Sequence, residues 1–445
     1  MRENRPPRPP RGWIDRDAAI VWHGFTQMAA FSETSPIIVD SAEGHELIDT
    51  EGRRYLDAIS SLWLCTLGHR VPELDEALVD QLGKVAHSTL LGNGNTVVVD
   101  LAEALARVVP VEKPHIMFAS DGAAAVEQAL KIAFQYWWNM GERGRTSYLA
   151  LGDAYHGDTV GSLSVGAGGF GSDLFDPIKF PVVRTPGYND PRWLEAALEA
   201  LRDRAEDLAA VVIEPLVQAA AGMRIGDPDD LRHLGEACRE SGILLICDEV
   251  ATGFGRTGSL FASTLCDLSP DLMCLGKGIT GGYLPMSATV ASKKVFDAFL
   301  ERASDSADTD RTFYHGHSYG GNALAAAVAL RHLELIEERN VLSNVRARAT
   351  ELKEALASRI ATLEAVSEVR QCGLMVGVEL VPPAPPTRLG RLVSQAAVQR
   401  GVLLRPLGDV VVIMPPLTVR SDEILRVVEV LRESILEQCA ASSGT

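Results

Sequence analysis

The sequence lacks the long apolar segments typical of membrane proteins and the basic excess typical of nucleic-acid-binding proteins. Its 445 residues contain no run of about 18 apolar residues, so we expect no transmembrane helix. The formal net charge is −17, and such an acidic chain is a poor partner for nucleic acids or anionic membranes. The net charge says little about the substrate, because local positive charge can still lie in a pocket.

Cysteine is also scarce, and its placement disfavours several kinds of site. The seven cysteines are odd in number, and no two form a Cys-x-x-Cys pair. We expect neither a disulfide framework nor a zinc site, and a reduced, cytoplasmic setting fits best. His315 and His317 have no acidic residue beside them, so we expect no metal there. No Gly-x-Gly-x-x-Gly motif opens a β-α-β unit, which disfavours a nicotinamide-dependent dehydrogenase.

The remaining composition is that of a globular protein with more than one domain. Hydrophobic residues make up 46% of the chain and charged residues 23%. Residues 1–15 are rich in Pro and Arg and lack the apolar segment of a signal peptide, which predicts a disordered tail. We expect residues 16–65 and 326–445 to form a small domain, and residues 66–325 a large one.

Short apolar runs alternate with helical patterns through the predicted large domain. The runs predict buried strands at residues 116–119, 147–151, 210–213, 243–247 and 272–275. Apolar residues at helical spacing predict helices at 122–138, 193–209 and 229–241. The alternation predicts an α/β domain with a mostly parallel sheet, in which ligands bind at the carboxyl ends of the strands.

After about residue 325 the pattern changes to that of a smaller α+β domain. Helices are expected at residues 323–338, 345–360 and 421–439, and short strands at 366–370, 375–380 and 410–414. Residues 37–57 contain a Glu-Gly turn between alternating runs, which predicts a hairpin or meander joining this domain.

Asp248 and Lys277 are the most informative residues, because each follows an apolar strand. A lysine in such a place can form a Schiff base with a carbonyl group. An aspartate there can keep the ring nitrogen of pyridoxal phosphate protonated, which makes the ring an electron sink. The alternative is a buried ion pair between neighbouring strands, in which each charge compensates the other.

Other residues near strand ends fit a cofactor or substrate site. Gly122 and Ala123 open a helix, where backbone N–H groups can bind a phosphate, although glycine often stands there for steric reasons. Tyr155 fits an aromatic side chain stacked on a planar ring, or a buried aromatic at a strand end. Glu214 fits a carboxylate that orients a neighbouring polar group, or a buried carboxylate whose hydrogen bonds are satisfied within the protein. Arg405 fits a carboxylate clamp or a surface side chain.

Four motifs follow one another along the chain: Ser120-Asp-Gly-Ala123, Tyr155-His-Gly-Asp158, Asp248-Glu-Val-Ala-Thr-Gly-Phe-Gly-Arg256 and Gly276-Lys-Gly278. In order and spacing the chain resembles the class III pyridoxal-phosphate-dependent aminotransferases, from about Trp22 to Leu431. The resemblance implies an aspartate-aminotransferase-like fold of type I, pyridoxal 5'-phosphate as cofactor and ping-pong kinetics. It also implies a homodimer with shared active sites.

The resemblance also implies a role for each matching residue. Lys277 would be the Schiff-base lysine and proton shuttle, Asp248 the partner of the ring nitrogen, and Tyr155 the aromatic side chain bordering the ring. The cofactor would also contact Gly122, Ala123, Glu214 and, from the partner subunit, Ser318. The substrate would contact Phe25, Trp63, Tyr283, Gly316 and Arg405, the last through its carboxylate.

Further segments resemble family members of biotin biosynthesis: Trp22-His-Gly-Phe-Thr-Gln-Met28, Ser60-Ser-Leu-Trp63, Thr280-Gly-Gly-Tyr283 and Arg405-Pro-Leu-Gly408. This implies 8-amino-7-oxononanoate as acceptor, 7,8-diaminononanoate as product, and lysine or S-adenosylmethionine as amino donor. Users of S-adenosylmethionine commonly have a Trp-Trp pair and a Tyr where this chain has Leu62-Trp63 and Phe25, which favours lysine. The alternatives are an ω-amino-acid or diamine:2-oxo-acid aminotransferase and a cofactor-binding protein without catalysis.

Overall fold

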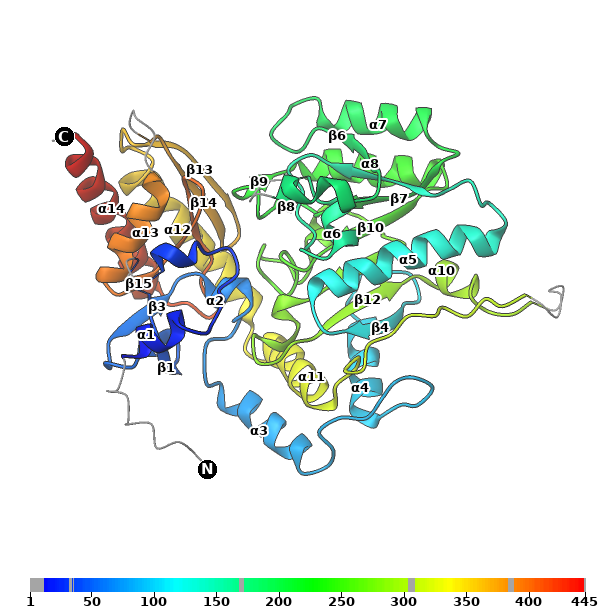
Figure 1. Ribbon diagram of the computed structural model, residues 1–445, viewed down its shortest axis with the longest axis horizontal. Helices are drawn as coiled ribbons and strands as arrows, with labels where there is room; N and C mark the ends of the chain where they lie inside the picture. The colour runs from blue at the N-terminus through cyan, green and yellow to red at the C-terminus, as the bar shows by residue number, and fades with distance from the viewer. Residues whose placement is uncertain are drawn as a thin grey trace, which may run out of the picture.

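The computed structural model describes residues 12–31, 34, 36–167, 172–302, 309–382 and 388–443. They form a larger part around a seven-stranded sheet and a smaller part with two four-stranded sheets (Figure 1). The predicted fold class, a mostly parallel α/β sheet with a smaller α+β part, is confirmed.

The large sheet has the strand order β4–β12–β11–β10–β7–β5–β6. Its strands are β4 (His115–Ala119), β5 (Ser147–Leu151), β6 (Val183–Thr185), β7 (Leu208–Ile213), β10 (Leu244–Asp248), β11 (Leu272–Leu275) and β12 (Ser287–Ala291). Only β12 runs antiparallel to its neighbours, so the other strands of this sheet all end at the same edge. The five strands predicted from apolar runs are all present; β6 and β12 were not predicted.

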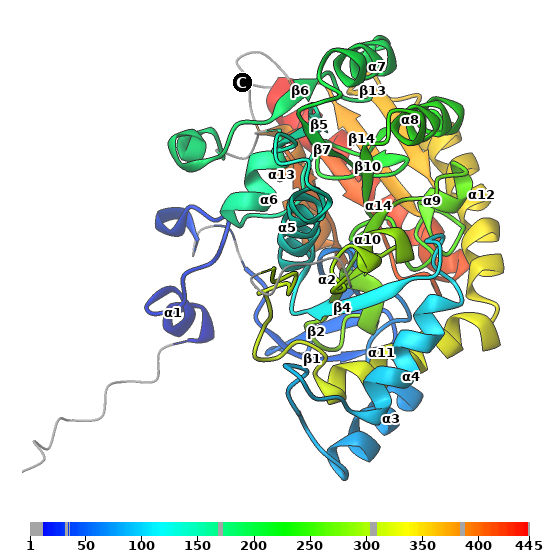
Figure 2. The same ribbon diagram turned by 90° about the vertical axis from the view of Figure 1, so that its right-hand side faces the viewer.

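Helices cover both faces of this sheet, because alternate side chains of each strand point to opposite sides. Tyr148 and Ala150 pack with α5 (Gly122–Met140) on one face. Leu149 and Leu151 pack on the other face with α7 (Trp193–Asp203) and α8 (Pro228–Glu240), as Figure 2 shows. The predicted helix at 193–209 is too long, because the fully buried strand β7 already begins at Leu208.

Strands from both ends of the chain build the smaller part. One sheet has the order β1–β2–β3–β15 and the other β13–β14–β17–β16. These strands are β1 (Val39–Glu43), β2 (Glu46–Asp49), β3 (Arg54–Asp57), β13 (Val366–Cys372), β14 (Met375–Leu380), β15 (Val402–Leu403), β16 (Arg405–Leu407) and β17 (Val410–Ile413). Because β3 pairs with β15, the predicted meander at 37–57 joins the C-terminal part as expected.

The helices of the smaller part are α12 (Val341–Arg359), α13 (Leu389–Gln399) and α14 (Ser421–Ser443). The predicted helix at 345–360 thus begins four residues earlier, after Asn340, which adopts a φ of 50°. The remaining elements are α1 (Trp13–Ala18), η1 (Met28–Ala30), α2 (Ser60–Trp63), α3 (Pro72–Leu82), α4 (Thr96–Ala106), α6 (Val160–Val165), η3 (Ser172–Ile178), β8 (Val217–Gln218), β9 (Arg224–Ile225), α9 (Ala262–Leu265), η4 (Lys277–Thr280), α10 (Lys293–Asp297) and α11 (Ala323–Glu338).

The N-terminal segment differs from the prediction at its inner end. Residues 1–11 of the predicted tail lie outside the described residues, but α1 begins at Trp13, within the range expected to be disordered. The turn is stabilised locally, because the Arg16 N–H donates to the Gly12 carbonyl (3.1 Å) and the Arg16 guanidinium lies 4.2 Å from the Trp13 ring.

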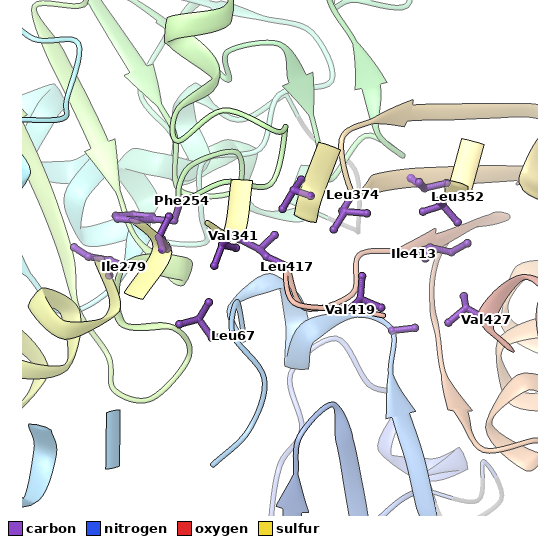
Figure 3. Packing of buried hydrophobic residues seen from close by; sticks show 14 of the residues in the cluster. Leu67, Phe254, Ile279, Val341, Leu352, Leu374, Ile413, Leu417, Val419 and Val427 are labelled. Atoms are coloured by element: carbon purple, nitrogen blue, oxygen red, sulfur yellow. The ribbon is translucent and has the colours of Figure 1, made fainter. Parts of the chain in front are cut away.

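One continuous apolar core connects the larger and smaller parts (Figure 3). Phe254 and Ile279 enter it from loops that follow β10 and β11. Leu374, Ile413 and Val427 enter it from the smaller part, and all five side chains are at most 1% exposed. The two parts therefore fold against each other around shared buried surface.

Membrane-spanning helices and metal-binding clusters are both absent from the described residues. No helix in these ranges is long and apolar enough to cross a membrane. Within the same ranges, no three His, Cys, Asp or Glu side chains gather in a way that could hold a metal ion. Five of the seven cysteines are buried.

Candidate active site

A cavity of about 450 Å³ lies at the edge where the parallel strands end. The loops after β4, β5, β7, β10 and β11 line it, together with one side chain from the N-terminal segment. The lining residues are Trp63, Asp121, Gly122, Ala123, Tyr155, His156, Gly157, Asp158, Thr159, Glu214, Ala220, Asp248, Val250, Ala251 and Lys277. Seven of the predicted site residues are among them, although they are spread over 215 positions of the chain (63 to 277).

One end of the cavity is the N-terminus of α5, which fits an anion. Asp121 caps the helix by accepting a hydrogen bond from the Ala124 N–H (3.0 Å), as its position predicts. The N–H groups of Gly122 and Ala123 stand in the first turn, where they have no acceptor within the helix. A Cβ on Gly122 would lie 2.6 Å from Cγ1 of Val250, so only glycine permits this close approach.

At the other side of the cavity, Asp248 is held by a histidine. Nδ1 of His156 lies 2.7 Å from Oδ2 of Asp248, and the Val250 N–H donates to Oδ1 (3.0 Å). Both side chains are buried. Burial by itself would lower the pKa of His156, but the hydrogen bond and charge of Asp248 outweigh it and raise that pKa. The carboxylate of Asp248 therefore favours the protonated form of the buried imidazole.

Lys277 lines the same cavity as Asp248 and begins η4 with a φ of 42°. Its Nζ lies 5.0 Å from the centre of the Trp63 ring. Burial lowers the pKa of this amine, opposed by the negative charges of Asp248 and Glu214. A lowered pKa increases the fraction of neutral, nucleophilic amine at neutral pH.

Glu214 and Tyr155 meet between the ends of β7 and β5. The buried Glu214 carboxylate accepts hydrogen bonds from the N–H groups of Tyr155 (3.0 Å) and Ala219 (3.3 Å). Burial raises the pKa of Glu214 to about 7, with the charge of His156 opposing the shift. The Tyr155 hydroxyl donates to Asp158 (3.0 Å), which keeps the ring at the cavity wall. Glu214 thus fixes the backbone of the loop that carries Tyr155.

Two predicted substrate residues line a second cavity, of about 360 Å³. Phe25 reaches it from the N-terminal segment with 66% of its surface exposed. Arg405 reaches it from β16, and burial lowers the pKa of its guanidinium. Within the described ranges Arg405 has no carboxylate partner, so its charge is available to an anion.

Three further predicted residues lie outside both cavities. The Tyr283 hydroxyl accepts a hydrogen bond from the Val71 N–H (2.6 Å) and donates to the Val71 carbonyl (3.2 Å). Gly316 and Ser318 are exposed, and the Ser318 carbonyl accepts from Nε2 of His87 (2.7 Å). These three residues therefore do not line the cavity that contains Lys277.

The sequence pattern did not predict a role for His156, although this residue stands in the motif Tyr155-His-Gly-Asp158. The motif was interpreted through the neighbouring Tyr155, because an aromatic side chain can stack beside a planar cofactor. The available signal was an ionisable residue in the loop after a buried strand, because a buried carboxylate such as Asp248 needs a partner for its charge.

The comparisons with known proteins agree with this geometry. The model of the family "Aminotransferase class-III" matches residues 28–435. An adenosylmethionine-8-amino-7-oxononanoate aminotransferase of Nitratidesulfovibrio vulgaris is 44% identical, over 94% of this chain and 81% of that protein.

Two solved structures resemble the whole chain. The crystal structure of adenosylmethionine-8-amino-7-oxononanoate aminotransferase from Methanocaldococcus jannaschii has a TM-score of 0.90 at 36% identity, covering 95% of this chain and 98% of that one. The omega transaminase of Pseudomonas jessenii in complex with PMP has a TM-score of 0.88 at 26% identity, covering 96% and 98%. Family match, identity and coverage together establish that this chain is a member of the class III aminotransferases.

Proposed function

We propose that this aminotransferase uses pyridoxal 5'-phosphate to convert 8-amino-7-oxononanoate into 7,8-diaminononanoate, a step of biotin biosynthesis. The observation that carries the proposal is the single cavity shared by Lys277, the Asp248–His156 pair and the N-terminus of α5. The names of the relatives support the choice of acceptor.

Two groups in the cavity suit the cofactor, one its phosphate and the other its ring nitrogen. The free N–H groups of Gly122 and Ala123 would hold its phosphate, because a helix N-terminus favours an anion. Asp248 would pair with the ring nitrogen, and the charged imidazole of His156 keeps that carboxylate fixed and paired. When bound, the cofactor supplies an electron sink for breaking a bond at the carbon that carries the amino group.

Lys277 would perform the proton transfers. Its lowered pKa and partial burial provide a neutral amine that can attach to the cofactor aldehyde. Once displaced by the donor, the same amine can take a proton from the donor and later return one to the product carbon. The wall formed by Trp63 keeps water away from that amine, because the ring covers it at 5.0 Å.

Arg405 would bind the carboxylate of the acceptor. Its guanidinium lacks an acidic partner within the described part of the chain and lies at a cavity lined by Phe25. An extended acceptor with a terminal carboxylate can place its reacting group near Lys277 and its acid group at Arg405, which a short substrate cannot do.

Two donors remain in competition. The names of the relatives include adenosylmethionine, which supports S-adenosylmethionine as the amino donor. Leu62 and Phe25 replace an indole and a phenol typical of its users, which supports lysine. In the structure Leu62 is 42% exposed and Phe25 lines the second cavity.

We further infer a cytoplasmic homodimer with shared active sites. The position of Ser318 supports the dimer, because this exposed residue lies away from the chain's own cavity and fits a contact with the cofactor of a partner subunit. Mixing Lys277→Ala and Ser318→Asp subunits tests it: shared sites predict that the mixture recovers activity that neither variant has. Light scattering gives the mass independently.

The decisive experiment offers lysine and S-adenosylmethionine separately to the reconstituted enzyme with 8-amino-7-oxononanoate. Formation of 7,8-diaminononanoate with either donor supports the proposal and identifies the donor. A third reaction pairs simple amines with pyruvate. Turnover there, with no product from 8-amino-7-oxononanoate, would instead favour the ω-aminotransferase alternative, which the likeness to the omega transaminase structure also suggests.

A further inference from the structure

Trp63 stands at the end of a left-handed turn. Ser60, Ser61, Leu62 and Trp63 have consecutive φ values of 50°, 48°, 71° and 74°. L-residues rarely adopt this conformation once, and a run of four without glycine is strained. Such strain persists only where surrounding contacts hold it, and it is concentrated at functional sites.

Asp57 is the centre of the contacts that hold this turn. Its fully buried carboxylate accepts hydrogen bonds from the Ser61 N–H (2.9 Å) and the Ser61 hydroxyl (2.8 Å). Nε2 of His69 lies 3.0 Å from the same carboxylate, and Nδ1 of His69 lies 3.7 Å from Sγ of Cys65. Asp57 therefore holds the turn directly at Ser61. Through His69 it is also linked to Cys65, which follows the turn.

The turn is also tied to Met414, which directly follows β17 in the smaller part. The Ser60 hydroxyl donates to the Met414 carbonyl (2.7 Å), and the Met414 N–H donates to the Ala58 carbonyl (2.7 Å). The start of the strained segment is therefore anchored to the smaller part, which restricts the position of the turn that carries Trp63.

These contacts together determine the position of Trp63. The side chain is only 6% exposed, lines the cavity and covers Nζ of Lys277. Its indole N–H is buried and has no acceptor among the described residues. A buried donor without an acceptor at a cavity wall fits a polar group of a bound molecule.

We propose that Asp57 is a positioning residue of the aminotransferase reaction: through the left-handed turn it sets the indole of Trp63 over Lys277. Asp57 touches neither the cavity nor Lys277 and acts through Trp63 alone. The inference deepens the proposed function and relies on it only for the choice of substrate.

A double-mutant cycle with Asp57→Asn and Trp63→Ala tests this. Asp57→Asn keeps the size of the side chain and one acceptor oxygen but loses the charge. We expect kcat/KM to fall roughly 10- to 100-fold, because a displacement of about 1 Å in an active site costs that much. In the Trp63→Ala background, where no indole is left to position, Asp57→Asn should change kcat/KM less than about twofold. Independent, multiplicative losses would overturn the proposal.

Asp49→Asn is the matched control. Asp49 is a buried carboxylate of the same sheet that accepts from the N–H groups of Glu51 and Arg53 and from the Tyr55 hydroxyl, away from the cavity. The Asp49→Asn variant should lose thermal stability and keep the kcat/KM of the wild type. If Asp57→Asn does not fold, Ser61→Ala removes one hydrogen bond to Asp57 and should lower kcat/KM roughly three- to tenfold, again only when Trp63 is present.

The same cycle can be followed in the donor half-reaction alone, through the absorbance change of the bound cofactor with a simple amine. If the wild type makes no 7,8-diaminononanoate, the proposed function fails while this readout still tests Asp57. If the wild type makes the product and the two losses multiply, only the role of Asp57 fails.

Discussion

His156 and Asp248 form a buried pair in which Nδ1 of the imidazole lies 2.7 Å from Oδ2 of the carboxylate. The two residues are 92 positions apart in the sequence and come from the ends of β5 and β10, which β7 separates in the sheet. The histidine compensates the charge of Asp248 through this contact, and both residues line the cavity. The carboxylate can therefore offer negative charge to a cationic ring nitrogen without being unpaired when the site is empty.

Replacing His156 by leucine should leave this carboxylate buried without its cationic partner. We expect the free energy of unfolding to fall by about 3 kcal/mol at pH 6, since breaking a buried pair costs this much. The pKa of His156 is raised above the unfolded value of 6.5, so its contribution is complete below pH 6.5 and is lost as pH rises through the folded pKa. Urea unfolding at several pH values measures it. A loss that is independent of pH would contradict the charged pair.

Lys277→Ala should abolish turnover, because no other amine lines the cavity among the described residues. The variant should also lack the absorbance of lysine-bound pyridoxal phosphate at roughly 420 nm, which arises from the covalent link. Wild type and variant are compared after equal reconstitution and desalting. Retained turnover would disprove the assignment of Lys277.

Arg405→Ala should weaken acceptor binding and leave the donor half-reaction nearly unchanged. Loss of a charge-assisted hydrogen bond to a carboxylate costs about 1.5–3 kcal/mol, so KM for 8-amino-7-oxononanoate should rise roughly 10- to 100-fold. Arg405→Lys should restore only part of this, because it keeps the charge and loses the paired N–H groups. An equal loss in both half-reactions would show that Arg405 does not recognise the acceptor.

His69 should make stability depend on pH in the alkaline range. Burial lowers its pKa, but the hydrogen bonds to Asp57 and Cys65 outweigh that and raise the pKa to about 10. Between the unfolded value of 6.5 and about 10, only the folded chain holds this proton, so the contribution of His69 to stability falls as pH rises. His69→Gln should reduce that slope by at most about 1.4 kcal/mol per pH unit. Denaturant titrations at pH 6, 8 and 9.5, with equal slopes in both proteins, would refute the coupling.

Local sequence determined five of the seven strands of the large sheet and the two central residues of the site. Continuous apolar runs predict buried strands because only a sheet covered on both faces hides every side chain of a run. Asp248 and Lys277 follow two of those runs directly, and parallel strands bring their carboxyl ends to one edge. Their meeting in one cavity was therefore predictable from position alone, as was the cap that Asp121 places on α5.

Tertiary structure decided what lies around those two residues. The pairing of His156 with Asp248 depends on the order of β5, β7 and β10 in the sheet, which strand patterns do not encode. The left-handed turn that carries Trp63 contradicts the local preferences of its residues and persists because Asp57 and the anchor at Met414 hold it. The separation of Arg405 from Lys277 into two cavities likewise follows from the packing of the smaller part against the larger, because their shared core forms only in the folded chain.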